Sequence, residues 1–571
     1  TSIEIPDSVT SIGDYAFYDC AALTSIEIPD SVTSIGDYAF YYCTSLETVS
    51  MGNGVTSIGE YAFSDCKSLT DITIPDGVTS IGDYAFNYCT SLETVSMGDG
   101  VISIGVCAFN HCTFLTGIKL PDSLTSIGDY AFNYCTSLET VSMGNSVTSI
   151  GENAFSDCKS LTSITIPDSV TSIGEGAFYG CSSLEFNEYA GVYYLGTASN
   201  PYLFLVKVKV KDNSVTSVTI HKDTKFISGF AFNACGSLTS IIIPDGVVSI
   251  GDYAFYNCTS LTSVTFPESL TSIGDYAFYN CTSLTGIIIP DGVTFIGIYA
   301  FYNCNSLTSV TVPAGVTSIG NYTFYNCNSL TSATIPGGVT SIGKYAFYNC
   351  NSLTSIEIPA GVTSIGEYAF SECESLKSII IPDSVTAIGE RAFSECISLT
   401  SITIPDSVTA IEEGAFHGCS SLEFNEYAGV YYLGNANNPY LVLVEVKDNS
   451  VTSVTIHRDT KFISEWAFYD CTLLTSVTIP DGVVSIGDYA FYNCASLTGI
   501  IIPYGVTFIG VFAFYNCNSL TSVTFENTRG WLVSASVWYI ETNIASEELA
   551  DPSTAATYLK STYNYYYWKR S

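Results

Sequence analysis

The sequence has few charged residues, and basic residues are the scarcer kind. Charged residues are 13% of the 571, with 18 Lys and Arg against 55 Asp and Glu, so the formal net charge is -37. A surface of this sign repels phosphate backbones and anionic lipid, so we expect no nucleic-acid partner. No apolar run in the sequence approaches the roughly 18 residues that a membrane-spanning helix needs. We therefore expect no membrane span in this segment.

Histidine is also rare, and this argues against familiar catalytic sets. The four histidines are His111, His221, His417 and His457. None lies in a recognisable nucleophile–base–acid pattern. A carbohydrate-cleaving site would need two carboxylates that lie close together outside any repeat. The best candidates, Glu188 and Asp212, recur as Glu426 and Asp448 in a second copy of the same segment, which favours architecture over catalysis. We expect no enzyme activity and no cofactor.

The abundant feature is a repeat of 23 residues. Cysteines begin a column at Cys20, Cys43 and Cys66, and the column ends at Cys517 with 20 Phe–Cys units in all. Only Cys107 stands outside this register. The consensus unit is LTSITIPDSVTSIGDYAFYNCTS. Repeats of this length indicate a stacked array rather than several globular domains.

Each part of the unit has a local structural meaning. L-x-x-I-x-I is the alternation of a short strand with one buried face, and the following Pro ends that strand. V-x-x-I-G turns a second apolar pair inward, and A-F-x-x-C-x-x-L closes the coil with a tight helical or 3₁₀ turn. One coil cannot bury its own apolar face, but stacked coils can. The sequence therefore predicts a solenoid of about 22 stacked coils, with short parallel strands on one face and tight turns or 3₁₀ segments on the other.

The period is broken twice. Both breaks carry EFNEYAGVYYLG, then NPYL and a KDNSVTSVTIH stretch, and they enlarge a coil by 8 and 6 residues. Each reads as two strands joined by an Asn/Pro turn. The first residues fall inside a repeat, so we expect that the natural N-terminus lies upstream. The predicted organisation is regular coils over 1–184, 215–422 and 451–525, irregular enlarged coils over 185–214 and 423–450, and a C-terminal cap over 526–571 whose Asp551-Pro552 pair opens a short helix.

The unit L-x-x-I-x-I-P-x-x-V-x-x-I-G-x-x-A-F-x-x-C resembles the BspA-like, Treponema-type leucine-rich repeats over roughly residues 1–525. The resemblance implies a leucine-rich-repeat arch that is extracellular or on the cell surface. It also implies adhesion or ligand binding, with a protein or glycan on host or neighbouring cells as the partner. The alternative is a structural role, in which solenoids self-associate into a filament or surface layer.

The spacing of the cysteine column indicates buried thiols rather than disulfide bonds. Stacked coils place equivalent Cβ atoms about 4.8 Å apart and parallel, whereas disulfides want about 3.5–4.5 Å and converging geometry. We expect reduced, inaccessible thiols that act as small apolar residues. Cys107, His111 and Cys112 have metal-like spacing, but Cys112 belongs to the buried column and no fourth ligand is evident. We therefore expect no metal site.

Two further columns leave alternatives open. Carboxylates follow the Gly in most coils, as at Asp14, Asp37 and Glu60, and form either a solvated edge or a calcium-binding row. Tyrosines recur in two columns, near Tyr15 and near Tyr256, and are either half-buried stacks or contact surfaces. The solvated edge and the stacks are the favoured interpretations.

Candidate contact residues depart from the pattern. The middle residue of each strand should face solvent, and Thr there suits an exposed strand. Isoleucine replaces it at Ile242, Ile288, Ile380 and Ile501, which makes these four candidate contacts. The irregular coils add tyrosines that could grip a long ligand at two places, although these coils could equally serve only to absorb curvature. These tyrosines are Tyr193, Tyr194 and Tyr202 in the first coil, and Tyr431, Tyr432 and Tyr440 in the second.

Overall fold

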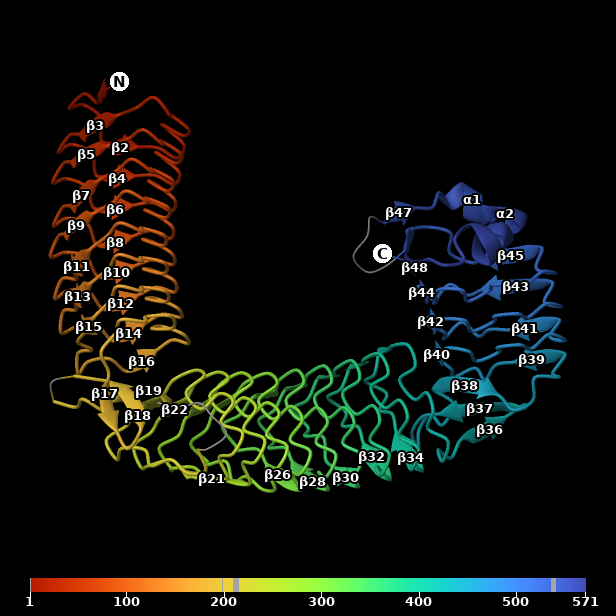
Figure 1. Cartoon of the computed structure of the whole chain (residues 1–571). Coiled ribbons are helices and arrows are strands. Elements are labelled where there is room, and N and C mark those ends of the chain that lie inside the picture. Colours follow the sequence, from red (N-terminus) through yellow and green to blue (C-terminus); the bar gives the residue numbers. More distant parts are fainter. Residues whose placement is uncertain (1, 198, 209–214, 536–540, 571) are drawn as a thin grey trace. The chain divides into compact units, whose positions relative to one another are not determined.

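A computed structural model describes residues 2–197, 199–208, 215–535 and 541–570. It divides into two compact units, Thr1–Tyr279 and Asn280–Ser571, each of which is a stack of coils. A regular coil contributes one strand of up to four residues at L-x-x-I-x-I and a two-residue strand just before the Gly. Figure 1 shows successive coils stacked with these strands in register. The predicted leucine-rich-repeat solenoid is confirmed.

In the first unit, longer and shorter strands form separate columns. The longer strands are β1 (Ser2–Glu4), β3 (Ser25–Ile28), β5 (Thr48–Met51), β7 (Asp71–Ile74), β9 (Thr94–Met97), β11 (Gly117–Lys119), β13 (Thr140–Ser142), β15 (Ser163–Ile164), β21 (Ser240–Ile242) and β23 (Ser263–Thr265). The shorter ones are β2 (Ser11–Ile12), β4 (Ser34–Ile35), β6 (Ser57–Ile58), β8 (Ser80–Ile81), β10 (Ser103–Ile104), β12 (Ser126–Ile127), β14 (Ser149–Ile150), β16 (Ser172–Ile173), β20 (Phe226–Ile227), β22 (Ser249–Ile250) and β24 (Ser272–Ile273).

The second unit repeats both columns. Its longer strands are β26 (Ser309–Thr311), β28 (Ser332–Thr334), β30 (Ser355–Ile356), β32 (Ser378–Ile380), β34 (Ser401–Thr403), β39 (Ser453–Thr455), β41 (Ser476–Thr478), β43 (Gly499–Ile502) and β45 (Ser522–Phe525). Its shorter strands are β25 (Phe295–Ile296), β27 (Ser318–Ile319), β29 (Ser341–Ile342), β31 (Ser364–Ile365), β33 (Ala387–Ile388), β35 (Ala410–Ile411), β40 (Phe462–Ile463), β42 (Ser485–Ile486) and β44 (Phe508–Ile509).

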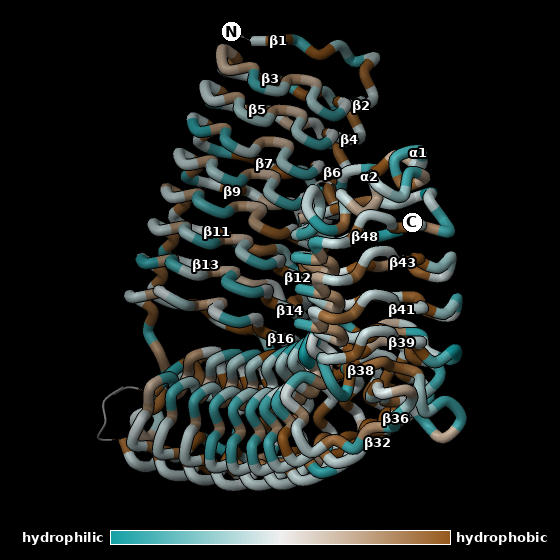
Figure 2. The backbone as a smooth tube through the Cα atoms, turned by 90° about the vertical axis from the view of Figure 1, so that its right-hand side faces the viewer, coloured by the Kyte–Doolittle hydropathy of each residue, from teal (hydrophilic) through white to brown (hydrophobic). Residues whose placement is uncertain are grey.

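Equivalent residues of neighbouring coils lie directly above one another. Ser25 pairs with Thr48 and Ile26 with Val49 in parallel register. Phenylalanine rings stack in the same way, with centroids 5.3 Å apart for the Phe109–Phe132 pair. Figure 2 shows hydrophobic and hydrophilic residues recurring at the same place in successive coils. The core of each unit is therefore a set of continuous columns, mainly of Leu, Ile, Val, Phe and Cys.

The A-F-x-x-C segment differs from the predicted helical or 3₁₀ turn. It is a run of β-turns in which two residues per coil, such as Tyr38 and Tyr42, adopt a left-handed backbone with φ of 56° and 63°. The N–H groups of Tyr38, Phe40 and Tyr42 donate to carbonyls of the next coil at 2.7–3.0 Å. A left-handed non-glycine residue costs about 1–2 kcal/mol, and this ladder offsets that cost by satisfying the backbone between coils.

The acidic column also has a structural task. The Asp14 Oδ1 atom accepts a hydrogen bond from the Asp37 N–H of the next coil at 2.9 Å, and Asp37 accepts likewise from Glu60 at 2.8 Å. Asn321 keeps the same bond, to Lys344 N–H at 2.8 Å, without a charge. The bond needs a short side-chain oxygen rather than a carboxylate, which supports the solvated-edge interpretation.

The irregular coils are antiparallel three-stranded insertions. The first contains β17 (Asn187–Tyr189), β18 (Val192–Leu195) and β19 (Phe204–Val208), and the second contains β36 (Asn425–Tyr427), β37 (Val430–Leu433) and β38 (Val442–Val446). The strands β18–β19 and β37–β38 are the two predicted strand pairs. The last strand of each insertion then pairs in parallel with the next coil, β19 with β20 and β38 with β40. Each insertion thus restarts the column of short strands.

The C-terminal residues close the last coil. The strand β48 (Tyr567–Arg570) pairs antiparallel with β44, and β46 (Trp531–Ser534) and β47 (Thr542–Asn543) extend that sheet. The helices α1 (Ser546–Ala550) and α2 (Pro552–Thr557) pack against β45, and a π-helical turn η1 (Tyr558–Thr562) follows α2. The Asp551 side chain accepts from Ser553 N–H at the start of α2, which confirms the predicted helix cap. Trp531 and Trp568 are buried under this layer.

Among the described residues, no helix has the length and apolar character to cross a bilayer.

Candidate binding site at the second irregular coil

The four out-of-pattern isoleucines lie on the surface. Ile242, Ile380 and Ile501 stand in the longer strands β21, β32 and β43, and Ile288 occupies the equivalent strand position. Their exposed fractions are 71% for Ile242, 87% for Ile288, 72% for Ile380 and 54% for Ile501. The predicted outward orientation is confirmed, whereas a role in contacts stays a proposal.

The tyrosines of the irregular coils divide into two kinds. Tyr194 and Tyr432 are fully buried, so the prediction that these two contact a ligand is wrong. The cause is the alternation of strand β18 and of strand β37, which turns every second residue inward. The Tyr194 hydroxyl accepts from His221 N–H at 3.0 Å, so it serves the core. Tyr193 and Tyr431, on the other faces of these strands, are half-buried.

Tyr202 and Tyr440 belong to a packed aromatic cluster in each insertion. The Tyr202 ring lies 4.0 Å from His221, and the Tyr440 ring lies 4.0 Å from His457. Each also meets the buried tyrosine edge-on, at 5.5 Å. Both remain half-buried. The same ring contacts occur in both copies, which indicates that the cluster mainly stabilises the packing of each insertion.

In the second copy, the two carboxylate candidates have separate hydrogen-bond partners. Glu426 accepts a hydrogen bond from Lys447 at 2.8 Å, and Asp448 accepts from the Ser450 N–H at 2.8 Å. Glu188 is exposed, and Asp212 lies outside the described residues.

The cysteine column is reduced and almost entirely buried. None of the described cysteines forms a disulfide, and all but Cys20 are buried. The thiols also have a directional role, because Cys135 Sγ donates to the Phe109 carbonyl of a neighbouring coil at 3.2 Å. Burial raises the pKa of the Cys135 thiol to about 12. Among the described residues no group of three His, Cys, Asp or Glu side chains is placed to hold a metal.

The second irregular coil opens a cavity that the sequence analysis missed. The short strand β35 pairs with β33 but not with β38, so the column is interrupted there. A cavity of about 1240 Å³ lies at this interruption, within the second unit. Its wall includes Phe416 and Trp466. Phe416 stacks on Phe393 at 5.8 Å and is only partly buried on its other side. The cavity thus has apolar walls.

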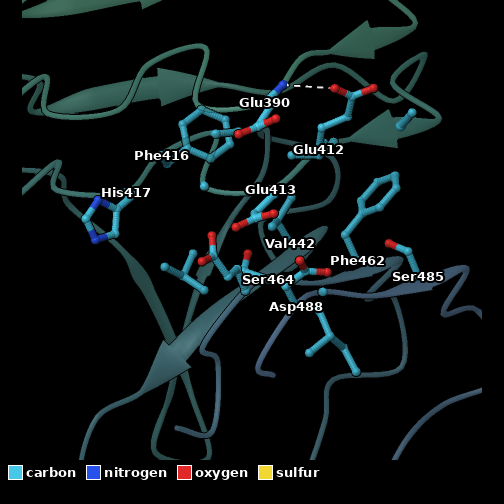
Figure 3. Close-up of a pocket in the computed structure, with 18 of the residues that line it drawn as sticks. Glu390, Glu412, Glu413, Phe416, His417, Val442, Phe462, Ser464, Ser485 and Asp488 are labelled. Atoms are coloured by element: carbon cyan, nitrogen blue, oxygen red, sulfur yellow. Dashed lines mark hydrogen bonds between the residues drawn. The ribbon is translucent and has the colours of Figure 1, made fainter. Parts of the chain in front are cut away.

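Carboxylates gather at the same place. Seven of the lining side chains are Asp or Glu, and three are Lys. Figure 3 shows the Glu413 and Asp488 side chains near one another in the cavity, with Val442 beside them. Lys344 is engaged by Glu367 at 2.6 Å, and Lys569 by Glu541 at 3.4 Å. The cavity wall therefore has an excess of acidic residues over basic ones.

These carboxylates are poorly compensated. Asp488 is 3% exposed, and neither carboxylate oxygen of Glu465 accepts a hydrogen bond although both are buried. Burial, assisted by the Glu413 carboxylate, raises the pKa of Glu465 to about 8 and that of Asp488 to about 9. The Arg391 guanidinium partly offsets this for Glu465. The carboxylates are consequently poised to release a proton when a cation arrives.

The family model described as BspA type leucine rich repeat region matches the chain in six copies, over residues 1–116, 102–199, 210–331, 294–423 and 446–543. A leucine-rich repeat protein from Bacteroides ovatus is 28% identical, over 72% of this chain and 91% of that one, with a TM-score of 0.31. A leucine rich cell surface protein from Faecalibacterium prausnitzii is 28% identical over 75% and 88%, with a TM-score of 0.27. No protein with a curated description matches.

Proposed function

The chain belongs to the BspA-type leucine-rich repeat family, and on that basis we propose that it is a surface-exposed or secreted protein that binds macromolecules through its coils. The partner is a protein or glycan on host or neighbouring cells. A solenoid suits this task because each coil adds surface without changing the core.

The observation that carries the proposal is the set of exposed isoleucines. Ile288 is 87% exposed, at a strand position where other coils have threonine, as at Thr311 and Thr403. An exposed isoleucine gains free energy when a partner covers it, by about 25 cal/mol per Å² of apolar surface removed from water. Tyr193 and Tyr431 are the second proposed contacts, because their rings stay partly accessible on the insertions.

The test replaces three isoleucines in the second unit by the residue that the same column uses elsewhere. The triple variant I288T/I380T/I501T should bind a panel of immobilised matrix proteins and glycans about tenfold more weakly than the parent chain. Thr403→Ser is the matched control in the same column and should bind like the parent. Full binding by the triple variant would contradict the proposal. Ordered polymers in sedimentation at rising concentration, with no binding to the panel, would favour self-association instead.

A further inference from the structure

The two irregular coils are near-copies whose differences gather at the interruption. Four positions matter, and each pair gives the first copy and then the second. They are Phe204 and Val442, Lys207 and Glu445, Gly229 and Glu465, and Gly174 and Glu412. The first change removes bulk, and the other three each add a carboxylate, one of them in place of a lysine.

The smaller side chain of Val442 leaves space in the second irregular coil that Phe204 fills in the first. Phe204 pairs with Phe226 in register, and its ring meets Phe178 edge-on at 6.5 Å. Phe178 is consequently 6% exposed. Val442 occupies the equivalent place opposite Phe462, but its shorter side chain leaves Phe416 partly exposed to the cavity.

The added charge is only partly matched, because Lys344 and Lys569 of the cavity wall already pair with Glu367 and Glu541. Lys207 of the first copy lies over the Phe186 ring at 4.8 Å, and the second copy has Glu445 in its place. Glu413 contributes the coulombic repulsion that reaches both Glu465 and Asp488, so three carboxylates share one region. Keeping like charges in a partly buried site is costly unless the groups hold protons or a cation compensates them.

We propose that this cavity binds a Lys or Arg side chain from an extended basic segment of a partner protein, with the cationic end at Glu413 and the aliphatic stem against Phe416 and Trp466. The inference rests on the proposed function and names the chemistry of one partner. The volume of about 1240 Å³ exceeds one side chain, so it suits a segment of several residues rather than a small amine. The net charge of -37 steers such a segment toward the surface.

The test measures calorimetric binding of an alternating Leu–Arg hexapeptide to the full chain, with the Leu–citrulline peptide as the neutral probe. The parent chain should bind the Leu–Arg peptide and should show no binding of the Leu–citrulline peptide. Val442→Phe, which installs the residue of the first copy, should weaken binding at least about tenfold. Glu465→Gln/Asp488→Asn should weaken it similarly without depending on how Val442→Phe packs.

The first copy supplies a control pair of carboxylates, Glu175 and Asp252, at the positions equivalent to Glu413 and Asp488. Burial raises the pKa of Glu175 to about 8, and Glu175 and Asp252 interact closely there. Glu175→Gln/Asp252→Asn should change peptide affinity less than about twofold. Equal losses from both double variants, or none from either second-copy variant, would overturn the proposal, as would spermidine binding as tightly as the peptide. These outcomes do not bear on binding to the panel of matrix proteins and glycans, so a failure of this proposal is distinct from a failure of the proposed function.

Discussion

Asp488→Asn should change how the stability of the protein depends on pH. The Asp488 Oδ1 atom accepts from Val511 N–H at 2.9 Å, and Asn321 makes the same bond in its own coil, so the amide preserves the contact. Burial raises the pKa of Asp488 from its usual 3.8 to about 9. Between these values the native state holds a proton that the unfolded chain has released. The free energy of unfolding therefore falls as pH rises through this window.

The size of this pH effect follows from the one proton by which the native and unfolded states differ. That difference lowers the free energy of unfolding by about 1.4 kcal/mol per pH unit, which amounts to up to about 3 kcal/mol between pH 5 and pH 7. Asp488→Asn should remove the contribution of this carboxyl to the slope and leave that of Glu465, and it should gain stability over the parent as pH rises. Urea unfolding followed by circular dichroism at pH 5, 6, 7 and 8 measures both quantities.

The matched control is Asp37→Asn, at an exposed position with the same bond to the next coil. It should retain the slope of the parent chain. An unchanged slope in Asp488→Asn, or a slope lost equally in both variants, would refute the buried-carboxylate reasoning.

Three further predictions concern the core. Thiol titration should find few reactive groups natively and all 21 after denaturation, because only Cys20 is not buried; rapid native labelling of many thiols would contradict this. Phe132→Ala should cost about 3–5 kcal/mol in urea unfolding, since Phe132 is fully buried between two stacked rings; a cost under about 1 kcal/mol would argue against the ladder. Tyr432→Phe should cost about 1–3 kcal/mol because the His457 N–H loses its acceptor; a stability equal to the parent in the same assay would show that the bond contributes nothing.

The sequence predicted the features that recur in every coil, but not those that depend on contacts with one particular neighbouring residue or coil. The period placed Ile288 outward and Cys135 inward, because each column has one orientation in every coil. It did not predict the left-handed turns, since Tyr38 and Tyr42 are residues that normally avoid that conformation. The ladder of bonds to the next coil decides their backbone, and that ladder exists only once coils stack.

The cavity escaped prediction for a related reason. Val442 differs from Phe204 by a change that looks conservative in a strand, and the two copies were interpreted as equivalent. Its consequence is visible only opposite Phe416, where the missing ring leaves space. The readable signals were Glu412 in place of the usual Gly and Glu445 in place of Lys207.

Hydrogen–deuterium exchange of the full chain, with and without the Leu–Arg hexapeptide, tests the central claim most directly. The claim is that the second irregular coil, unlike the first, is a binding site for basic segments. The account predicts slower exchange on peptide addition at residues 408–419 and 461–488, with residues 170–181 unchanged. Protection spread equally over both copies, or absent from 408–419 and 461–488, would contradict it.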